Sequence, residues 1–136
     1  MEAFTTSDAV AVAEFRSALR VFLRRTERVA RESGLTPQRY LLLLMVKGAP
    51  DGSEQSTVTE LSERLQLAQS TVTELVSRAE DAGLLVREQS RSDARVAHLR
   101  LTDEGERRLQ SAFTALGTER ANLHEVIAHL DETALG

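Results

Sequence analysis

Four polar residues at the start of one predicted helix carry side chains suited to recognising the edges of nucleic-acid bases. They are Gln69, Ser70, Thr71 and Thr73. Val72 and Val76 recur at helical spacing and mark the opposite side of this helix as buried. A glutamine carboxamide can form two hydrogen bonds with adenine, and serine or threonine hydroxyls bind bases or phosphates. We therefore predict that this end of the helix contacts the major groove of DNA.

Positive charge is concentrated in one short part of the chain. The 136 residues have a formal net charge of −4, yet residues 87–100 hold four arginines against two acids, a net charge of +2. Arg87, Arg91 and Arg95 belong to this segment. The alternatives are a solvated tip and a contact with phosphates or the minor groove, and arginine is well suited to the second. We expect these arginines to contact DNA.

The elements that must position these residues are a helix-turn-helix and a β-hairpin behind it. Thr57 and Glu60 have the spacing of a capping box, which starts a short helix. The other predicted elements are a helix over 69–83 and strands over 84–87 and 95–101. Two short helices joined by a tight turn form a helix-turn-helix, and a strand, polar tip and strand form a hairpin wing.

Longer helices are predicted on both sides of this motif. Ser7 is the expected cap of the first helix, which Gly34 ends, and Thr36 with Pro37 starts a second one. Thr102 is expected to cap the next helix, which Gly117 kinks or breaks.

The predicted fold is mainly α with a small β-hairpin wing, in a single domain over 1–136. Its winged helix-turn-helix core covers 36–102, and dimerisation helices over 8–33 and 103–134 flank it. The terminal helices carry long apolar stripes that a small core can scarcely cover, which indicates a partner. A second copy of the chain is expected, because symmetric homodimers are common. The alternative is that the two helices pack only on each other within one chain.

The composition excludes several other kinds of protein. There is no cysteine, and His124 and His129 are five residues apart, which is not the spacing of a helical metal pair. No nucleophile motif, phosphate-binding loop or cofactor motif is present, so we expect no enzyme and no cofactor. The chain has no apolar run long enough to span a membrane and no evident signal peptide, so we expect a cytoplasmic protein.

Several motifs together resemble the MarR family of bacterial transcriptional regulators. The most specific are Ser92-Asp93-Ala94-Arg95 in the wing and Leu101-Thr102-Asp103-Glu104-Gly105 at the start of the next helix. The stretches 61–65, 70–76 and 83–85 also fit. The resemblance implies a triangular homodimer whose terminal helices interlock, and a repressor, or sometimes an activator, that a small molecule releases from DNA.

The resemblance also implies roles for individual residues. Asp93 would hold an arginine side chain or wing amides and so orient the wing tip, and Ser77 and Arg78 complete the expected DNA-binding set. Two positions depart from the family pattern. Ala68 stands where a capping hydroxyl or carboxylate is usual, and Glu74 is acidic. Glu74 either pairs with Arg78 four residues on or accepts a hydrogen bond from cytosine, and we favour the pair.

A ligand cleft is implied where the dimer helices meet the winged core. The family often binds phenolic compounds or aromatic carboxylates there, and the residues to test are Arg16, Arg20, Tyr40 and Leu44. Tyr40 and Leu44 can equally be ordinary core residues.

Two other functions are compatible with the fold. A winged helix that binds a protein instead of DNA, such as an antirepressor or assembly subunit, would suit the acidic total charge and Glu74. A metal sensor would lose DNA binding on chelation. The arginines of the wing favour DNA as the partner, with a pseudo-palindromic operator to match a twofold dimer.

Overall fold

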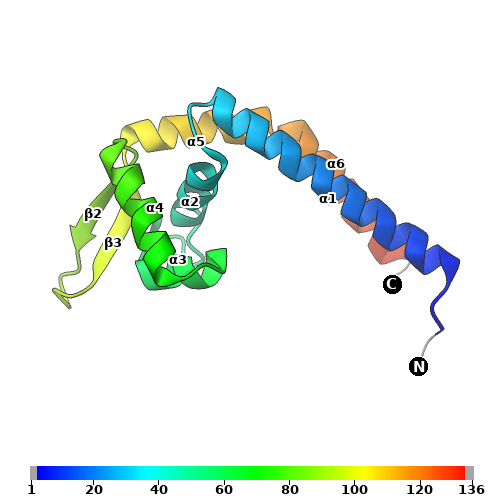
Figure 1. Cartoon of the computed structure of the whole chain (residues 1–136), viewed down its shortest axis with the longest axis horizontal. Coiled ribbons are helices and arrows are strands. Elements are labelled where there is room, and N and C mark those ends of the chain that lie inside the picture. Colours follow the sequence, from blue (N-terminus) through cyan, green and yellow to red (C-terminus); the bar gives the residue numbers. More distant parts are fainter. Residues whose placement is uncertain (1–2, 134–136) are drawn as a thin grey trace.

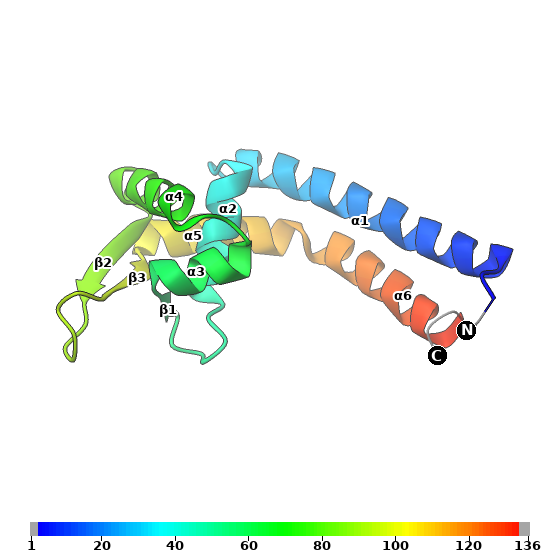
Figure 2. The ribbon, with the colours of Figure 1, turned by 60° about the horizontal axis from the view of Figure 1, so that its bottom comes forward.

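The computed structural model describes residues 3–133 and divides them into a compact head and an extended arm (Figure 1). The head contains α2 (Pro37–Lys47), α3 (Val58–Leu65), α4 (Gln69–Asp81) and a small sheet. The arm consists of α1 (Thr6–Glu32) and α6 (Gly117–Thr133), and α5 (Asp103–Ala115) joins it to the head. Figure 2 shows α1 and α6 side by side along the arm, which projects away from the head.

The sheet has three antiparallel strands in the order β1-β3-β2. They are β1 (Gln55–Ser56), β2 (Leu85–Gln89) and β3 (Ala97–Leu101). Leu85 pairs with Leu101 at the base of the hairpin, and Ser56 of β1 pairs with Leu99. The predicted mainly α fold with a hairpin wing is confirmed. The two-residue strand β1 was not predicted, because so short a segment has no alternating pattern to detect.

Threonine hydroxyls start three helices as predicted. Thr36, Thr57 and Thr102 each accept a hydrogen bond from the backbone N–H three residues later, at 3.1, 3.2 and 3.0 Å. Glu60 completes the capping box by accepting from the Thr57 N–H at 3.2 Å. These contacts are local, so the sequence is enough to predict them.

The expected cap at Ser7 is wrong. The first helix begins at Thr6 and its cap is Thr5, whose hydroxyl accepts from the Asp8 N–H while the Asp8 carboxylate accepts from the Thr5 N–H. Ser7 would have Val10 at the reciprocal position, and valine cannot return the hydrogen bond. The cap therefore lies two residues earlier, at Thr5, where both partners of the capping box are polar.

The head is held together by one aliphatic core. Leu42, Leu43 and Val46 of α2 are fully buried, as predicted for a helix that is apolar on several sides. The main residues packed around them are Leu61, Val72, Val76, Leu84 and Leu99. Because α3, α4 and the sheet share this core, the position of α4 relative to the hairpin is fixed.

Four residues connect the end of α4, the hairpin and the start of α5. We call them the joint: Gly83, Leu84, Thr102 and Gly105. The Thr102 N–H donates to the Leu84 carbonyl oxygen at 3.0 Å, and Thr102 Oγ1 donates to the Gly83 carbonyl oxygen at 2.6 Å. Gly105 lies so close that an added Cβ would be 2.3 Å from the Leu84 oxygen. Only glycine allows α5 to approach the head at this distance.

The substitution Gly105→Ala is expected to destabilise the fold by roughly 2 kcal/mol or more. The new methyl group would meet the Leu84 carbonyl, which is backbone and cannot rotate away. Urea unfolding followed by circular dichroism measures this difference. Gly117→Ala is the control, since a Cβ there meets only the end of the Arg120 side chain at 3.9 Å. Equal stability of the two variants would contradict the close approach at the joint.

Candidate nucleic-acid interface

The exposed face of α4 presents the polar residues that the sequence singled out. Val72, Val76 and Ala79 are buried in the core, so the other side of the helix faces solvent. The expected contact residues on this helix are all exposed: Gln69, Ser70, Thr71, Thr73, Ser77 and Arg78. A helix is narrow enough to enter the major groove, where hydrogen-bonding side chains on one face meet base edges.

The first turn of α4 has no side-chain cap. Ala68 occupies the cap position with extended backbone and provides no hydrogen bond, and no acidic residue lies in the first turn. The leading backbone N–H groups therefore keep their partial positive charge available to a ligand. A phosphate group has the complementary charge and geometry for such a helix end.

The side chain of Gln69 is turned toward α3. Its Nε2 donates to Thr59 Oγ1 at 3.3 Å, and both residues are exposed. Sequence analysis did not single out Thr59, because its position beside Gln69 depends on how two helices pack and not on local spacing.

Glu74 and Arg78 form the predicted pair along α4. Arg78 Nη2 lies 2.6 Å from Glu74 Oε1, and both side chains are 63% exposed. The interpretation of Glu74 as an intrahelical partner is confirmed. The pair is neutral overall, so this part of α4 presents hydrogen-bonding groups without net charge.

Arg87 is held at the base of the wing. Its Nη2 donates to Glu80 Oε1 of α4 at 2.9 Å. The ion pair connects β2 to the recognition face of α4 and neutralises the Arg87 charge. Of the three wing arginines, Arg87 is thus the one with an acidic partner on another element.

The wing tip leaves Arg91 and Arg95 directed outward. Asp93 Oδ1 accepts from the Arg95 N–H at 3.0 Å and from Arg95 Nε at 3.4 Å. The Arg95 side chain is nevertheless 92% exposed. Asp93 holds both the backbone and the near end of this side chain, which leaves the outer guanidinium nitrogens free to bind phosphate or base edges. Arg91 is exposed as well and makes no ion pair within residues 3–133.

The four residues expected to bind a small ligand do not come together in one chain. Leu44 lines a groove of about 300 Å³ between α2 and α5, together with Leu109 and Phe113. Arg16 and Arg20 line a different groove on α1. Burial raises the pKa of the Tyr40 hydroxyl, an effect that nearby Arg120 partly opposes. Tyr40 therefore stays neutral at physiological pH and keeps a proton to donate.

Arg120 is a candidate binding residue that sequence analysis missed. Its guanidinium lies 3.7 Å from the centre of the Phe113 ring, and its Nη1 is buried without a hydrogen-bond partner. A buried, unpaired guanidinium nitrogen favours an anionic or carbonyl ligand. The signal was available in the sequence: Arg120 lies four residues after Leu116 and three before Leu123, on the apolar stripe of the last helix.

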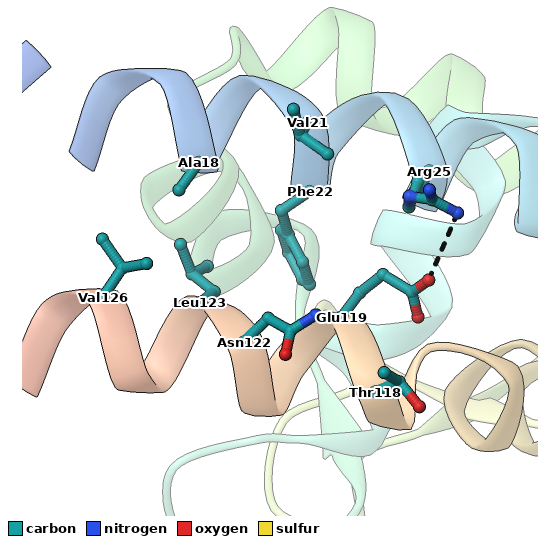
Figure 3. A pocket seen from close by; sticks show the side chains of 9 residues that line it. All are labelled: Ala18, Val21, Phe22, Arg25, Thr118, Glu119, Asn122, Leu123 and Val126. Atoms are coloured by element: carbon teal, nitrogen blue, oxygen red, sulfur yellow. Dashed lines mark hydrogen bonds and ion pairs between the residues drawn. The ribbon is translucent and has the colours of Figure 1, made fainter. Parts of the chain in front are cut away.

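The two helices of the arm enclose an apolar groove (Figure 3). It has a volume of about 400 Å³ and is lined by α1 and α6 residues that include Val21, Phe22 and Leu123. Arg25 and Glu119 form an ion pair at one end, with 3.5 Å between Nη1 and Oε1. Val21 and Leu23 remain 52% and 53% exposed, so packing of α1 on α6 leaves apolar surface uncovered.

The described residues offer little for other kinds of site. Residues 3–133 contain no group of three histidines, cysteines or acids placed to hold a metal ion. No helix in the same part of the chain is long and apolar enough to cross a membrane.

Known structures that match this chain share the same arrangement, a winged helix-turn-helix head on a helical arm. The sequence profile of the MarR family matches residues 33–96, which extend from the end of α1 to the wing. AbsC, a MarR family transcriptional regulator from Streptomyces coelicolor, superposes with a TM-score of 0.73 and 20% sequence identity. That match covers 97% of this chain and 92% of AbsC.

The matching structures include examples with bound DNA. A mutant of MepR from S. aureus bound to an oligodeoxyribonucleotide has a TM-score of 0.66 and 19% identity, over 90% of this chain and 84% of MepR. A mutant of MarR from E. coli complexed with operator DNA has a TM-score of 0.64 and 17% identity, over 89% and 91%. A search of curated protein sequences found no significant match.

The resemblance to the MarR family is confirmed. The profile match and the superpositions give this chain the fold of MarR family transcriptional regulators, whose members are not enzymes. At these identities the superpositions establish the fold alone.

Proposed function

We propose that this protein is a sequence-specific, double-stranded DNA-binding regulator of transcription that acts as a homodimer in the cytoplasm, as a repressor released by a small ligand. In this proposal α4 enters the major groove and the wing tip contacts the adjacent minor groove or its phosphates. The DNA-bound relatives MepR and MarR support DNA as the partner.

The observation that carries the proposal is the pairing of two different surfaces on one rigid head. The part of α4 from Gln69 to Arg78 exposes hydrogen-bonding side chains without net charge, and the wing tip beside it exposes Arg91 and Arg95. Hydrogen-bonding groups discriminate between bases, whereas free arginines supply affinity for the backbone. A surface that bound an acidic protein would need the arginines but not the ordered row of small polar residues.

Arg95→Ala is expected to weaken binding to the selected operator roughly tenfold and to reduce the salt dependence of binding by about one phosphate contact per subunit. Selection from random duplexes would first identify the operator, which should be pseudo-palindromic. Fluorescence anisotropy between about 50 and about 200 mM salt then measures both effects.

Arg28→Ala is the matched control for Arg95, because it removes an exposed arginine from the arm. Unchanged operator binding by the Arg95 variant would show that the wing tip does not contact DNA. Failure of the unmodified protein to bind any duplex at low salt would favour the protein-binding alternative.

The dimer is proposed from the apolar surface of the arm. Val10, Val12, Val21 and Leu23 are each at least half exposed on α1, although α6 already covers another side of this helix. A second copy brought against α1 would bury these side chains, and a twofold dimer would place two heads on one duplex.

The double substitution Val21→Asp, Leu23→Asp is expected to halve the mass of the protein in solution, from that of a dimer to that of one chain, 15.0 kDa. A charge at these positions opposes burial in a dimer, yet both side chains are exposed in the single chain, so the fold should survive. Light scattering after gel filtration measures the mass. Ala94→Asp at the wing tip is the control, and a dimer that persists in the double variant would contradict this interface.

The effector site is proposed to join residues from two copies. Tyr40 and Leu44 lie in the head and Arg16 and Arg20 in the arm, so one chain does not assemble them. A second copy would supply its α1 to the cleft between head and arm. An aromatic body with an acidic group would suit this set, since Leu44 is apolar, Tyr40 is a neutral donor and the arginines are cationic.

Salicylate is expected to release the operator, and the Arg16→Ala, Arg20→Ala double variant should need roughly tenfold more of it because two charge-assisted contacts are lost. Anisotropy of labelled operator follows the release. Arg31→Ala removes an exposed arginine of α1 that lies outside this groove and is the control. Release at the same concentration in all variants would exclude Arg16 and Arg20 from the site.

A further inference from the structure

Gln69 is the first residue of α4, and within residues 3–133 its side chain makes one hydrogen bond. The preceding residue, Ala68, has no polar side chain to organise this end of the helix. The hydrogen bond from Gln69 Nε2 to Thr59 Oγ1, at 3.3 Å, crosses from α4 to α3. The orientation of the carboxamide at the tip of the recognition helix is therefore set by a residue of the other helix.

Thr59 is a well-fixed anchor. It lies in the first turn of α3, between Thr57 and Glu60, whose reciprocal hydrogen bonds hold that turn. Leu61, two residues after Thr59, is fully buried in the core of the head. A rigid anchor reduces the number of orientations that the Gln69 amide can adopt, which lowers the entropy lost on binding.

The direction of this hydrogen bond leaves the acceptor end of the Gln69 amide free for a base. A carboxamide has a donor end and an acceptor end, and the donor Nε2 is directed at Thr59. Oε1 accepts no hydrogen bond within residues 3–133 and remains available to DNA, as does the second proton of Nε2. In the major groove, adenine N6 and cytosine N4 donate hydrogen bonds, whereas guanine O6 and thymine O4 accept them. The two-bond contact with adenine expected from the sequence stays compatible with this anchor, because Nε2 has a second proton that can be donated to adenine N7 while Oε1 accepts from N6.

We propose that Thr59 is a positioning residue for base recognition: it orients Gln69 so that Oε1 accepts a hydrogen bond from the exocyclic amino group of an adenine or a cytosine. This inference rests on the proposed binding of DNA. It adds a residue outside the recognition helix to the determinants of operator sequence and assigns a chemical class to the base that Gln69 contacts.

The Thr59 hydroxyl has a further use in this arrangement. While its oxygen accepts from Gln69, its own proton remains free to be donated. The first helix of a helix-turn-helix crosses the DNA backbone, so the acceptor for that proton is a phosphate oxygen. Thr59 thus contacts a DNA phosphate and Gln69 at the same time. The position of the DNA backbone relative to α3 therefore also determines where the Gln69 amide lies.

The test compares base preference in three variants. Gln69→Ala first identifies the contacted base pair as the position at which it loses selectivity. Thr59→Val keeps the shape of threonine but removes the hydroxyl, and it is expected to reduce discrimination at that base pair roughly fivefold. Thr59→Ser keeps the hydroxyl and should restore the preference. Thr118→Val removes an exposed threonine of the arm and serves as the control.

A double-mutant cycle separates positioning from a merely structural effect. If Thr59 acts through Gln69, Thr59→Val has no further effect on base discrimination in the Gln69→Ala background. Thermal unfolding of each variant checks that the head remains intact.

The inference is supported if an adenine or cytosine is preferred at the mapped position and Thr59→Val weakens that preference only when Gln69 is present. It is overturned if guanine or thymine is preferred on the contacted strand, if Thr59→Val leaves the preference unchanged, or if the two substitutions act additively. Failure of the unmodified protein to bind duplex DNA overturns the proposed function and this inference together, whereas the other outcomes leave DNA binding intact.

Discussion

The close contact between α5 and the Leu84 carbonyl is the constraint on which the rest of the molecule depends. Gly105 allows this approach, and Thr102 secures it with hydrogen bonds to Gly83 and Leu84. The end of α4, the base of the hairpin and the start of α5 all meet here. The directions of the recognition face, the wing and the arm are consequently fixed by a few backbone atoms, and side chains elsewhere refine an arrangement that the backbone already imposes.

Charge in this protein is arranged locally. Ion pairs neutralise two arginines close to the recognition face: Glu74 pairs with Arg78, and Glu80 pairs with Arg87. These pairs are partly exposed and contribute little to stability. They neutralise these two arginines, whereas the Arg95 side chain at the wing tip stays 92% exposed. An overall charge of −4 is then compatible with binding a polyanion, since long-range repulsion disfavours random attachment while a few cations act at short range.

Features with a local cause could be predicted from the sequence, and features that depend on packing could not. Caps at Thr57 and Thr102 follow from spacing within one turn, and the buried face of α4 follows from helical periodicity. The contact between Thr59 and Gln69 joins residues ten positions apart whose proximity depends on the crossing of two helices. Arg120 was overlooked for a different reason: an arginine on an apolar stripe is usually assumed to extend its charge into solvent.

The arm has a mechanical consequence. α1 has 27 residues and is about 40 Å long at the helical rise per residue. Its inner end is tied to α5, because Arg108 Nη1 donates to the Gly34 carbonyl oxygen at 2.8 Å. A rod of this length converts a small angular change at its base into a displacement of several ångströms at its far end. Substitutions far from any bound molecule can therefore change the separation between the two heads of the proposed dimer during evolution.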